Sequence, residues 1–358
     1  MQKTQLFKKQ DMKRKSLNVK KTIHKEILSY LSDEKINKIY KIFKENIKDI
    51  KKNNYYSAAI SGGPDSLALA FLLKCYNLET SQKVRYIHVD HGIKANSALE
   101  AKKTEHLLKK IDIKIKVLKW KGIKPSSNIQ SIARKNRYQI IFNYIKKKNI
   151  NTLFLGHNLD DLIENFFIRL TRGSGLDGFV SFNTKILENF DNKILIRPLI
   201  NVDKSELLYL TKKIFKSYVN DSSNKNPKFK RVRIRNIMQQ FKDEGLDYQK
   251  LKKTIFNLSD SNSSIKFYVN RNIDCNVTFL TKNKVLLSKF FFEQPSEIVF
   301  RSIKEIIMKV SKNYYPPRGK KVINLIEYLK SNNFKKSTLA GCIIEKFNDS
   351  VVIFRGKR

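Results

Sequence analysis

Six consecutive residues that separate an apolar run from an apolar helical pattern have the types needed to hold phosphate: Ser61, Gly62, Gly63, Pro64, Asp65 and Ser66. Paired glycines let the backbone approach a ligand closely and adopt positive φ. A helix that begins directly after them presents unpaired N–H groups and a partial positive charge of about half a unit. The run therefore predicts a phosphate-binding loop, in which the serines offer hydroxyl donors and Asp65 offers a contact for Mg²⁺.

An ordinary connection is the alternative for this loop, because a Gly-Gly turn whose aspartate caps a helix is common. The complete order of strand, loop and helix favours phosphate binding over that alternative. The loop is not a Walker A motif, since no G-K-[ST] sequence follows it and no lysine is placed to reach over the phosphates.

Imidazole and carboxylate groups accompany the ends of two other apolar runs: His88, Asp90 and His91 in the first, and His157, Asp160, Asp161 and Glu164 in the second. On a helix, positions 157, 161 and 164 share one face, so their side chains can converge on a metal ion or a proton-transfer site. Acids at a helix start also complement its dipole, which is the alternative explanation. The recurrence of acid beside imidazole at a neighbouring strand end favours the chemical site.

Arginines form a third group of candidates. Arg134 and Arg137 lie three residues apart, and Tyr138 follows Arg134 at a spacing of four. They could clamp phosphate or the charge on a leaving group, although arginines lying along the surface would show the same spacing. Arg172 precedes Gly173, which is expected to be a left-handed helix C-cap.

A basic stretch further along the chain has a different pattern. Arg231, Arg233 and Arg235 alternate with Val232 and Ile234. Alternation predicts an extended segment that carries three cations on one side. Such an arrangement suits a phosphate backbone.

The elements that must position these groups alternate along the chain. Strands are expected at Tyr55 to Ile60, Val84 to Asp90, Lys114 to Trp120, Thr152 to Gly156 and Ile194 to Arg197, and helices at Ser66 to Tyr76, Ala98 to Ile111, Asn128 to Lys148 and Leu159 to Leu170. This order predicts right-handed βαβ units and a parallel sheet covered on both faces. Ligands of such sheets lie beyond the carboxyl ends of the strands, where the candidate residues stand.

Composition sets the remaining bounds. The chain has 358 residues, 41% of them apolar, and 73 Lys plus Arg against 32 Asp plus Glu give a formal charge of +41. Its three cysteines, Cys75, Cys275 and Cys342, form no C-x-x-C pair, which argues against a secreted disulfide scaffold. No apolar run approaches the roughly 20 residues that span a bilayer, so a cytoplasmic location without membrane partners is expected. The charge makes RNA the first partner to consider, although coding bias explains such a composition equally well.

The length of the chain and the changes in its local composition predict several regions. Residues 1–52 are expected to form a basic N-terminal extension with a helical pattern at Ile36, Ile39, Phe43, Ile47 and Ile50. Residues 53–236 are expected to form the nucleotide-binding α/β domain, followed by smaller helical and α+β regions over 237–358. Aromatics of the last region, such as Tyr248, Phe256 and Tyr268, suit stacking on RNA or ordinary core packing. Oligomeric state stays open, a homodimer being one option.

The motifs in their order resemble a known family. The loop at residues 61–66 is similar to the S-G-G-x-D-S signature of the PP-loop ATP pyrophosphatases. The ordered set over about residues 55–236 resembles the tRNA(Ile)-lysidine synthetase family, through His88-Val89-Asp90-His91-Gly92, Ala133-Arg134-x-x-Arg137-Tyr138, Gly156-His157-x-x-Asp160-Asp161-x-x-Glu164, Arg172-Gly173-Ser174-Gly175, Arg197-Pro198-Leu199 and Asp221-x-Ser223-Asn224. Asn165, Asn226 and Val232 depart from that pattern, and Thr338 to Cys342 resembles a C-terminal segment of some members.

The resemblance implies an adenine nucleotide alpha-hydrolase-like fold and a two-step reaction. ATP adenylates O2 of the wobble cytidine (position 34) in the CAU anticodon of tRNA(Ile) and releases pyrophosphate. Free L-lysine then attacks C2 and releases AMP. The product, lysidine, pairs with A instead of G, so the tRNA reads AUA in place of AUG.

Site roles are assigned on this basis. ATP binding is expected at residues 61–66 with His88, Asp90 and His91, and the catalytic residues are expected to be Asp65, Arg134, His157, Asp161 and Glu164. Asp65 would place Mg²⁺, Arg134 would neutralise developing charge, and Asp161 with its two neighbours would receive the lysine ammonium. Contacts with tRNA are expected from Arg137, Arg172, Arg231, Arg233 and Arg235.

Two other functions stay open. Another PP-loop enzyme, such as a tRNA thiolase or an amide-forming ligase, would use the same loop, but thiolation would want paired cysteines near the site. A basic RNA-binding protein without catalysis would bind tRNA and release no AMP.

Overall fold

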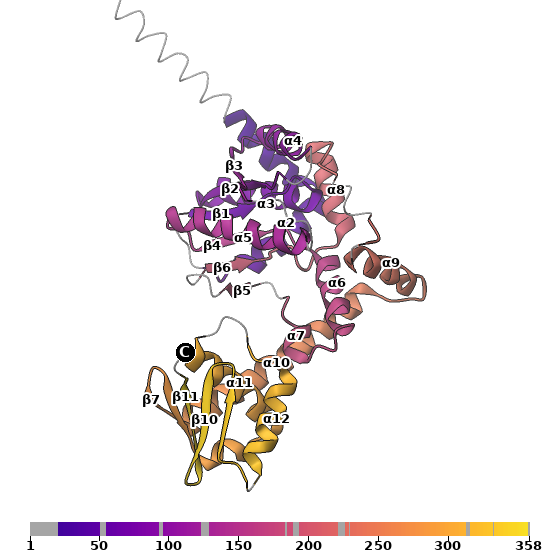
Figure 1. Cartoon of the computed structure of the whole chain (residues 1–358). Coiled ribbons are helices and arrows are strands. Elements are labelled where there is room, and N and C mark those ends of the chain that lie inside the picture. Colours follow the sequence, from indigo (N-terminus) through magenta and orange to yellow (C-terminus); the bar gives the residue numbers. More distant parts are fainter. Residues whose placement is uncertain are drawn as a thin grey trace, which may run out of the picture. The chain divides into compact units, whose positions relative to one another are not determined.

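The computed structural model describes residues 21–50, 55–92, 96–122, 129–182, 185–188, 193–220, 226–228, 230–312, 316–331 and 333–356. The chain divides into two compact units, Met1–Ile255 and Phe256–Arg358 (Figure 1). The motif Asp221-x-Ser223-Asn224 lies outside the described residues.

The N-terminal unit is built on a six-stranded sheet in the order β3-β2-β1-β4-β6-β5. Its strands are β1 (Tyr55–Ala59), β2 (Lys83–Asp90), β3 (Ile115–Lys119), β4 (Thr152–Leu155), β5 (Lys185–Glu188) and β6 (Lys193–Ile196). The first four and β6 are parallel, as predicted, while β5 is an unpredicted antiparallel edge strand. The strand order reverses between β1 and β4, which is where open parallel sheets bind ligands.

Helices connect the strands, namely α3 (Pro64–Thr80), α4 (Ser97–Lys109), α5 (Ile129–Lys147) and α6 (Leu159–Leu170), and α8 (Lys204–Phe215) follows the last strand, β6. Every predicted strand and helix is found within a few residues of its expected bounds, and α6 has the bounds expected. Helix α3 begins two residues earlier than predicted, because Pro64 suits the first helical turn, where its missing N–H leaves no bond unmade.

The sheet is covered on both faces. Along β1, Tyr56 and Ala58 belong to one apolar core, whereas Tyr55 and Ala59 pack against another that includes Ile145 of α5. Successive side chains of a strand point to opposite faces, so these two cores lie on opposite sides of the sheet. Central strands buried on both faces read as continuous apolar runs rather than as alternating ones.

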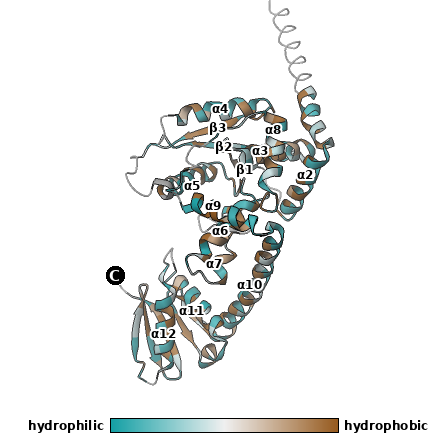
Figure 2. Cartoon of the chain, turned by 90° about the vertical axis from the view of Figure 1, so that its right-hand side faces the viewer, coloured by the Kyte–Doolittle hydropathy of each residue, from teal (hydrophilic) through white to brown (hydrophobic). Residues whose placement is uncertain are grey.

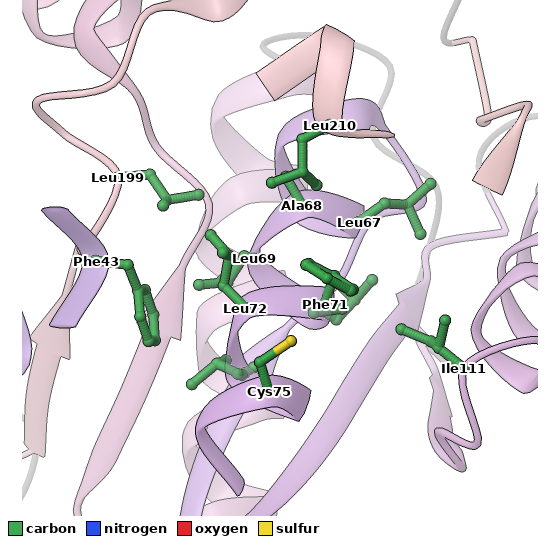
Figure 3. Packing of buried hydrophobic residues seen from close by; sticks show 14 of the residues in the cluster. Phe43, Leu67, Ala68, Leu69, Phe71, Leu72, Cys75, Ile111, Leu199 and Leu210 are labelled. Atoms are coloured by element: carbon green, nitrogen blue, oxygen red, sulfur yellow. The ribbon is translucent and has the colours of Figure 1, made fainter. Parts of the chain in front are cut away.

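Helix α3 is the centre of the larger core. All ten residues from Ser66 to Cys75 are buried, which is expected only for a helix surrounded by protein. Figure 3 shows its side chains among Phe43 of α2 (Glu34–Ile47) and Leu210 of α8. The apolar spacing predicted for the N-terminal region is confirmed at Ile36, Ile39, Phe43 and Ile47, which α2 buries, whereas Ile50 lies beyond the end of this helix.

Two short helical elements complete this unit, α7 (Leu176–Phe179) and α9 (Lys230–Asp243). Helix α9 corrects the extended segment expected at residues 231–235. Ile234 and Met238, four residues apart, pack on Leu162 and Ile163 of α6 in one core. The alternation that suggested a strand covers too few residues to outweigh this helical face.

The C-terminal unit is an antiparallel sheet with helices. Helix α10 (Tyr248–Asn276) begins before it, and its residues are both polar and apolar along its length (Figure 2). The strands are β7 (Val277–Thr281), β8 (Lys284–Leu287), β9 (Lys336–Leu339), β10 (Cys342–Phe347) and β11 (Ser350–Arg355), in the order β7-β8-β11-β10-β9. Helices α11 (Ser296–Ser311) and α12 (Gly319–Lys330) share its apolar core. Within the described ranges, none of the chain's helices has the length and apolar character needed to cross a bilayer.

Candidate active site

The loop after β1 has the backbone conformation that its glycines predict. Gly62 has φ +90°, and a Cβ atom there would lie 2.2 Å from Thr104 Oγ1 and 2.9 Å from Val219 Cγ2. The Val219 amide also donates to the Gly62 carbonyl at 2.9 Å. Only glycine fits this position without displacement of its neighbours.

Ser66 organises the loop from the first turn of α3. Its Oγ accepts from the amides of Ser61 and Gly62, at 3.2 and 3.1 Å, and lies 2.9 Å from the Gly63 carbonyl, to which it donates. The loop is therefore fixed by its own serine. The first N–H groups of a helix have no partners within it, so the start of α3 supplies donors for an anion.

Asp65 contacts a lysine that was not predicted. Lys204 Nζ, on the first residue of α8, lies 2.7 Å from Asp65 Oδ1 and 2.5 Å from Oδ2. Burial raises the pKa of Asp65, Lys204 opposes that rise, and the Asp161 carboxylate adds to it. The two aspartates therefore lie close enough to interact electrostatically, although they belong to the first turns of different helices, α3 and α6.

Asn158 connects these two aspartates and was also missed. It is the N-cap of α6. Its side-chain Oδ1 accepts from the Asp161 backbone N–H at 3.1 Å, and its own backbone N–H donates to Asp161 Oδ2 at 3.1 Å. The Asn158 side chain also lies near Asp65 and lowers the pKa of that carboxyl. Asp161 thus takes part in a capping box at the start of α6, which agrees with the alternative explanation that this acid serves the helix start. The same capping box places Asp161 near the loop at residues 61–66.

Glu164 lies one turn further along α6, with 3% of its side chain exposed. Its Oε1 accepts from Arg235 Nε of α9, whereas Oε2 is buried without a hydrogen-bond partner among the described residues. Burial raises the pKa of Glu164, and the Arg235 guanidinium opposes this. A buried carboxylate oxygen without a hydrogen-bond partner costs free energy, which indicates that a bound ligand supplies the donor.

His157 is held as a neutral imidazole. Arg197 Nε donates to His157 Nδ1 at 3.2 Å, and the Phe182 ring packs edge-on at a centroid distance of 5.1 Å. Burial, then the charges of Arg197 and Arg134, keep the pKa of His157 well below its usual value. Because Nδ1 accepts, Nε2 carries the proton and can act as a donor.

The end of β2 holds two more neutral histidines. His88 Nδ1 lies 2.9 Å from the Ile60 carbonyl, and burial lowers the pKa of His88. Arg137 Nε donates to His91 Nε2 at 3.1 Å, and burial with this arginine lowers the pKa of His91 to about 4. The Asp90 carboxylate accepts from the Gly92 amide at 3.0 Å.

The predicted arginines do not form one group. Arg134 lies over the ring of Tyr138, 5.2 Å from its centroid, and donates to its hydroxyl at 3.3 Å. Arg172 is exposed beside Gly173, whose φ of +62° confirms the predicted left-handed conformation, although the C-cap of α6 is Thr171.

Helix α9 places Arg233 on a different side from Arg231 and Arg235, which corrects the common side predicted for the three. Arg231 is exposed, and Arg233 donates to the carbonyls of Pro227 and Lys228 at 3.0 and 2.9 Å. Arg235 contacts Glu164, although 43% of its side chain is exposed.

These features define a class of protein. A glycine loop between the central strand and a buried helix, facing acids and an imidazole at the end of β4, is the site of a PP-loop nucleotide-binding domain, and the family model of the PP-loop domain matches residues 31–241. Similar proteins of known family show which family within this class the chain belongs to. The chain is 30% identical over 308 residues to the tRNA(Ile)-lysidine synthase of Wolbachia sp. subsp. Brugia malayi (strain TRS), covering 85% of this chain and 71% of that protein.

A second relative agrees. The tRNA(Ile)-lysidine synthase of Orientia tsutsugamushi (strain Boryong) is 31% identical over 324 residues, covering 87% of this chain and 72% of that protein. This chain belongs to the tRNA(Ile)-lysidine synthase family, which confirms the resemblance seen in its motifs.

A solved structure is similar in fold. The U34-tRNA thiolase of Methanococcus maripaludis, solved with its [4Fe-4S] cluster, has a TM-score of 0.53 and 19% identity, covering 63% of this chain and 79% of that one. At this identity the likeness concerns the fold alone.

Proposed function

We propose that this chain ligates free lysine to C2 of the wobble cytidine in a tRNA(Ile) with a CAU anticodon, converting ATP to AMP and pyrophosphate. One observation carries the proposal in a chain of this family. The nucleotide loop follows β1, the Asp161, Glu164 and His157 set follows the neighbouring strand β4, and Asp161 raises the pKa of Asp65 across this end of the sheet.

In the first step, the residue 61–66 loop and the start of α3 would hold the pyrophosphate as it leaves. Arg134, whose charge reaches His157, is the candidate for neutralising charge that develops on the α-phosphate. His88, Asp90 and His91 border the same end of the sheet and are proposed to line the nucleotide site.

The residues present fit a bound Mg²⁺. Asp65 already holds a cation on both carboxylate oxygens, the ammonium of Lys204, and Asp161 lies nearby. Among the described residues, no group of three or more His, Cys, Asp or Glu could hold a metal ion by itself. Mg²⁺ commonly uses one or two carboxylates together with substrate phosphates, and when bound it neutralises phosphate charge. Asp65, with Asp161, would hold it here.

In the second step, the lysine amine must lose a proton before it attacks C2. The Glu164 carboxylate, with its unpartnered buried oxygen, and Asp161 are proposed to receive the lysine ammonium. Burial raises the pKa of Glu164, which brings it closer to the range in which a carboxylate accepts a proton at neutral pH. His157 is proposed to donate from Nε2 and not to act as the base, because Arg197 occupies its Nδ1.

Contact with tRNA would use the exposed arginines and the basic charge. All five predicted arginines are exposed, and Arg137, Arg233 and Arg235 also have partners within the protein. We propose that residues 237–358 add affinity for the tRNA body and that the whole acts in the cytoplasm, where tRNA and ATP are present. An unpaired anticodon base can be splayed into a pocket, as proteins commonly read RNA.

The test is lysine transfer. Purified protein is incubated with ATP, Mg²⁺, radiolabelled lysine and a tRNA(Ile) transcript with C34, and label in RNA and AMP release are measured. We expect ATP-dependent incorporation that a C34-to-U34 transcript abolishes. Incorporation that survives this replacement would exclude the proposed substrate, and tRNA binding without AMP release would favour the non-catalytic alternative.

The thiolase alternative is weaker on one observation. Cys75 is the single cysteine of the sequence within residues 1–255, and it is buried in the α3 core, whereas a thiolation site would want paired cysteines. Thiolation of the same transcript, measured with a sulfur donor, is the discriminating assay.

A further inference from the structure

Lys204 occupies an unusual position for a lysine. It is the first residue of α8, where the unpaired N–H groups of the helix carry partial positive charge. A cation is unfavourable at this end of a helix, whereas the acid Glu206 in the same turn accepts from the Asp203 amide at 3.2 Å, as the dipole favours. A residue that breaks a local rule while its neighbours obey it commonly serves function.

The contact that Lys204 makes gives the reason. Its ammonium lies 2.7 and 2.5 Å from the two oxygens of Asp65, and 36% of the lysine side chain and 22% of the aspartate side chain are exposed. An ammonium is a compact point charge on a flexible stem, so this contact neutralises the carboxylate and can be broken without disturbing the core. The nearby Asp161 increases the need for a cation at this point.

We propose that Lys204 is a positioning residue that holds the place of the metal cation on Asp65 until nucleotide arrives. A divalent ion alone must displace this ammonium and gains few ligands by doing so. The triphosphate offers the ammonium another anion and offers the metal further oxygen ligands. Metal binding at Asp65 therefore depends on nucleotide. This inference rests on the proposed function, which requires ATP with Mg²⁺ at this loop.

A purely structural ion pair is the competing explanation. Lys213, on the same helix, provides the comparison, because its ammonium contacts Asp33, which lies away from the loop at the start of α2. If Lys204 only stabilised the fold, Lys204→Met and Lys213→Met would change stability alone. The proposal adds that Lys204→Met alters the affinity for a metal in the absence of nucleotide.

The experiment measures Mn²⁺ binding to the full chain without nucleotide, by electron paramagnetic resonance of the free ion. Wild-type protein and Lys213→Met are expected to bind Mn²⁺ weakly until a non-hydrolysable ATP analogue is added. Lys204→Met is expected to bind Mn²⁺ without the analogue about tenfold more tightly than wild type, because a carboxylate has lost its counter-charge. The double variant Lys204→Met/Asp65→Asn is expected to return to the wild-type affinity.

Equal Mn²⁺ affinities of wild-type and folded Lys204→Met protein would overturn the inference, as would a gain that persists in the double variant. Folding is checked by tryptophan fluorescence, and Lys204→Gln replaces Lys204→Met if the latter does not fold. The assay needs neither tRNA nor lysine. A protein that shows the Mn²⁺ gain but transfers no lysine refutes the proposed function alone, and one that transfers lysine without the gain refutes the inference alone.

Discussion

Gly62→Ala tests the geometry of the nucleotide loop. The new Cβ would lie 2.2 Å from Thr104 Oγ1, at a residue whose φ is +90°. Positive φ costs a non-glycine residue roughly 1–2 kcal/mol, and forcing a methyl group into a packed site costs about 1–3 kcal/mol. We therefore expect the free energy of unfolding of the N-terminal unit to fall by about 2–5 kcal/mol, with loss of binding of an ATP analogue.

Gly173→Ala is the matched control for this variant. Gly173 has φ +62°, and none of the described residues comes within 4 Å of its Cβ position, so alanine there incurs the conformational cost alone. The chain has a single tryptophan, Trp120 at the end of β3, so its fluorescence during urea unfolding reports this unit specifically. Adding Thr104→Ala to Gly62→Ala should recover part of the loss. Equal losses for the two glycine variants would refute the reasoning.

Three further outcomes are expected. Glu164→Gln should lower kcat/KM for lysine about tenfold to hundredfold and leave adenylation of the tRNA without lysine intact; a parallel loss in adenylation would contradict the assignment. His91 has a folded pKa of about 4, below its unfolded 6.5, so the unfolded chain takes up the proton first and stability should fall as pH drops through this window, less steeply in His91→Asn by urea titration. Arg231→Ala should flatten the slope of log K for tRNA against log salt by about 0.7–0.9, and Arg233→Ala, whose guanidinium bonds its own backbone, should not.

The architecture of the N-terminal unit is readable from the sequence because each of its parts has a local signal. Short apolar runs alternate with longer helical patterns, and βαβ handedness then leaves few arrangements. The antiparallel strand β5 has no such signal, because a four-residue edge strand is decided by pairing with β6. Helix α9 was misread because five alternating residues imitate a strand, while the helical spacing of Ile234 and Met238 appears only over a longer window.

The site divides in the same way. Residues in the loop and at the strand ends are found from their types and from the rule that ligands bind at the carboxyl ends of parallel strands. Lys204 and Asn158 were missed because their roles depend on contacts between segments distant in sequence: Lys204 lies 139 residues from Asp65. The cation at the start of a helix was the one available signal for Lys204.

The burial of α3 from Ser66 to Cys75 constrains how the enzyme can move. A helix that is closely packed by surrounding side chains cannot slide or rotate without opening cavities, and such cavities cost free energy. The loop proposed to hold the phosphates is therefore attached to a rigid helix. Adjustment to a bound nucleic acid is therefore expected at the beginnings of α6 and α8. These contact the start of α3 through polar groups, which can change partners at little cost in free energy.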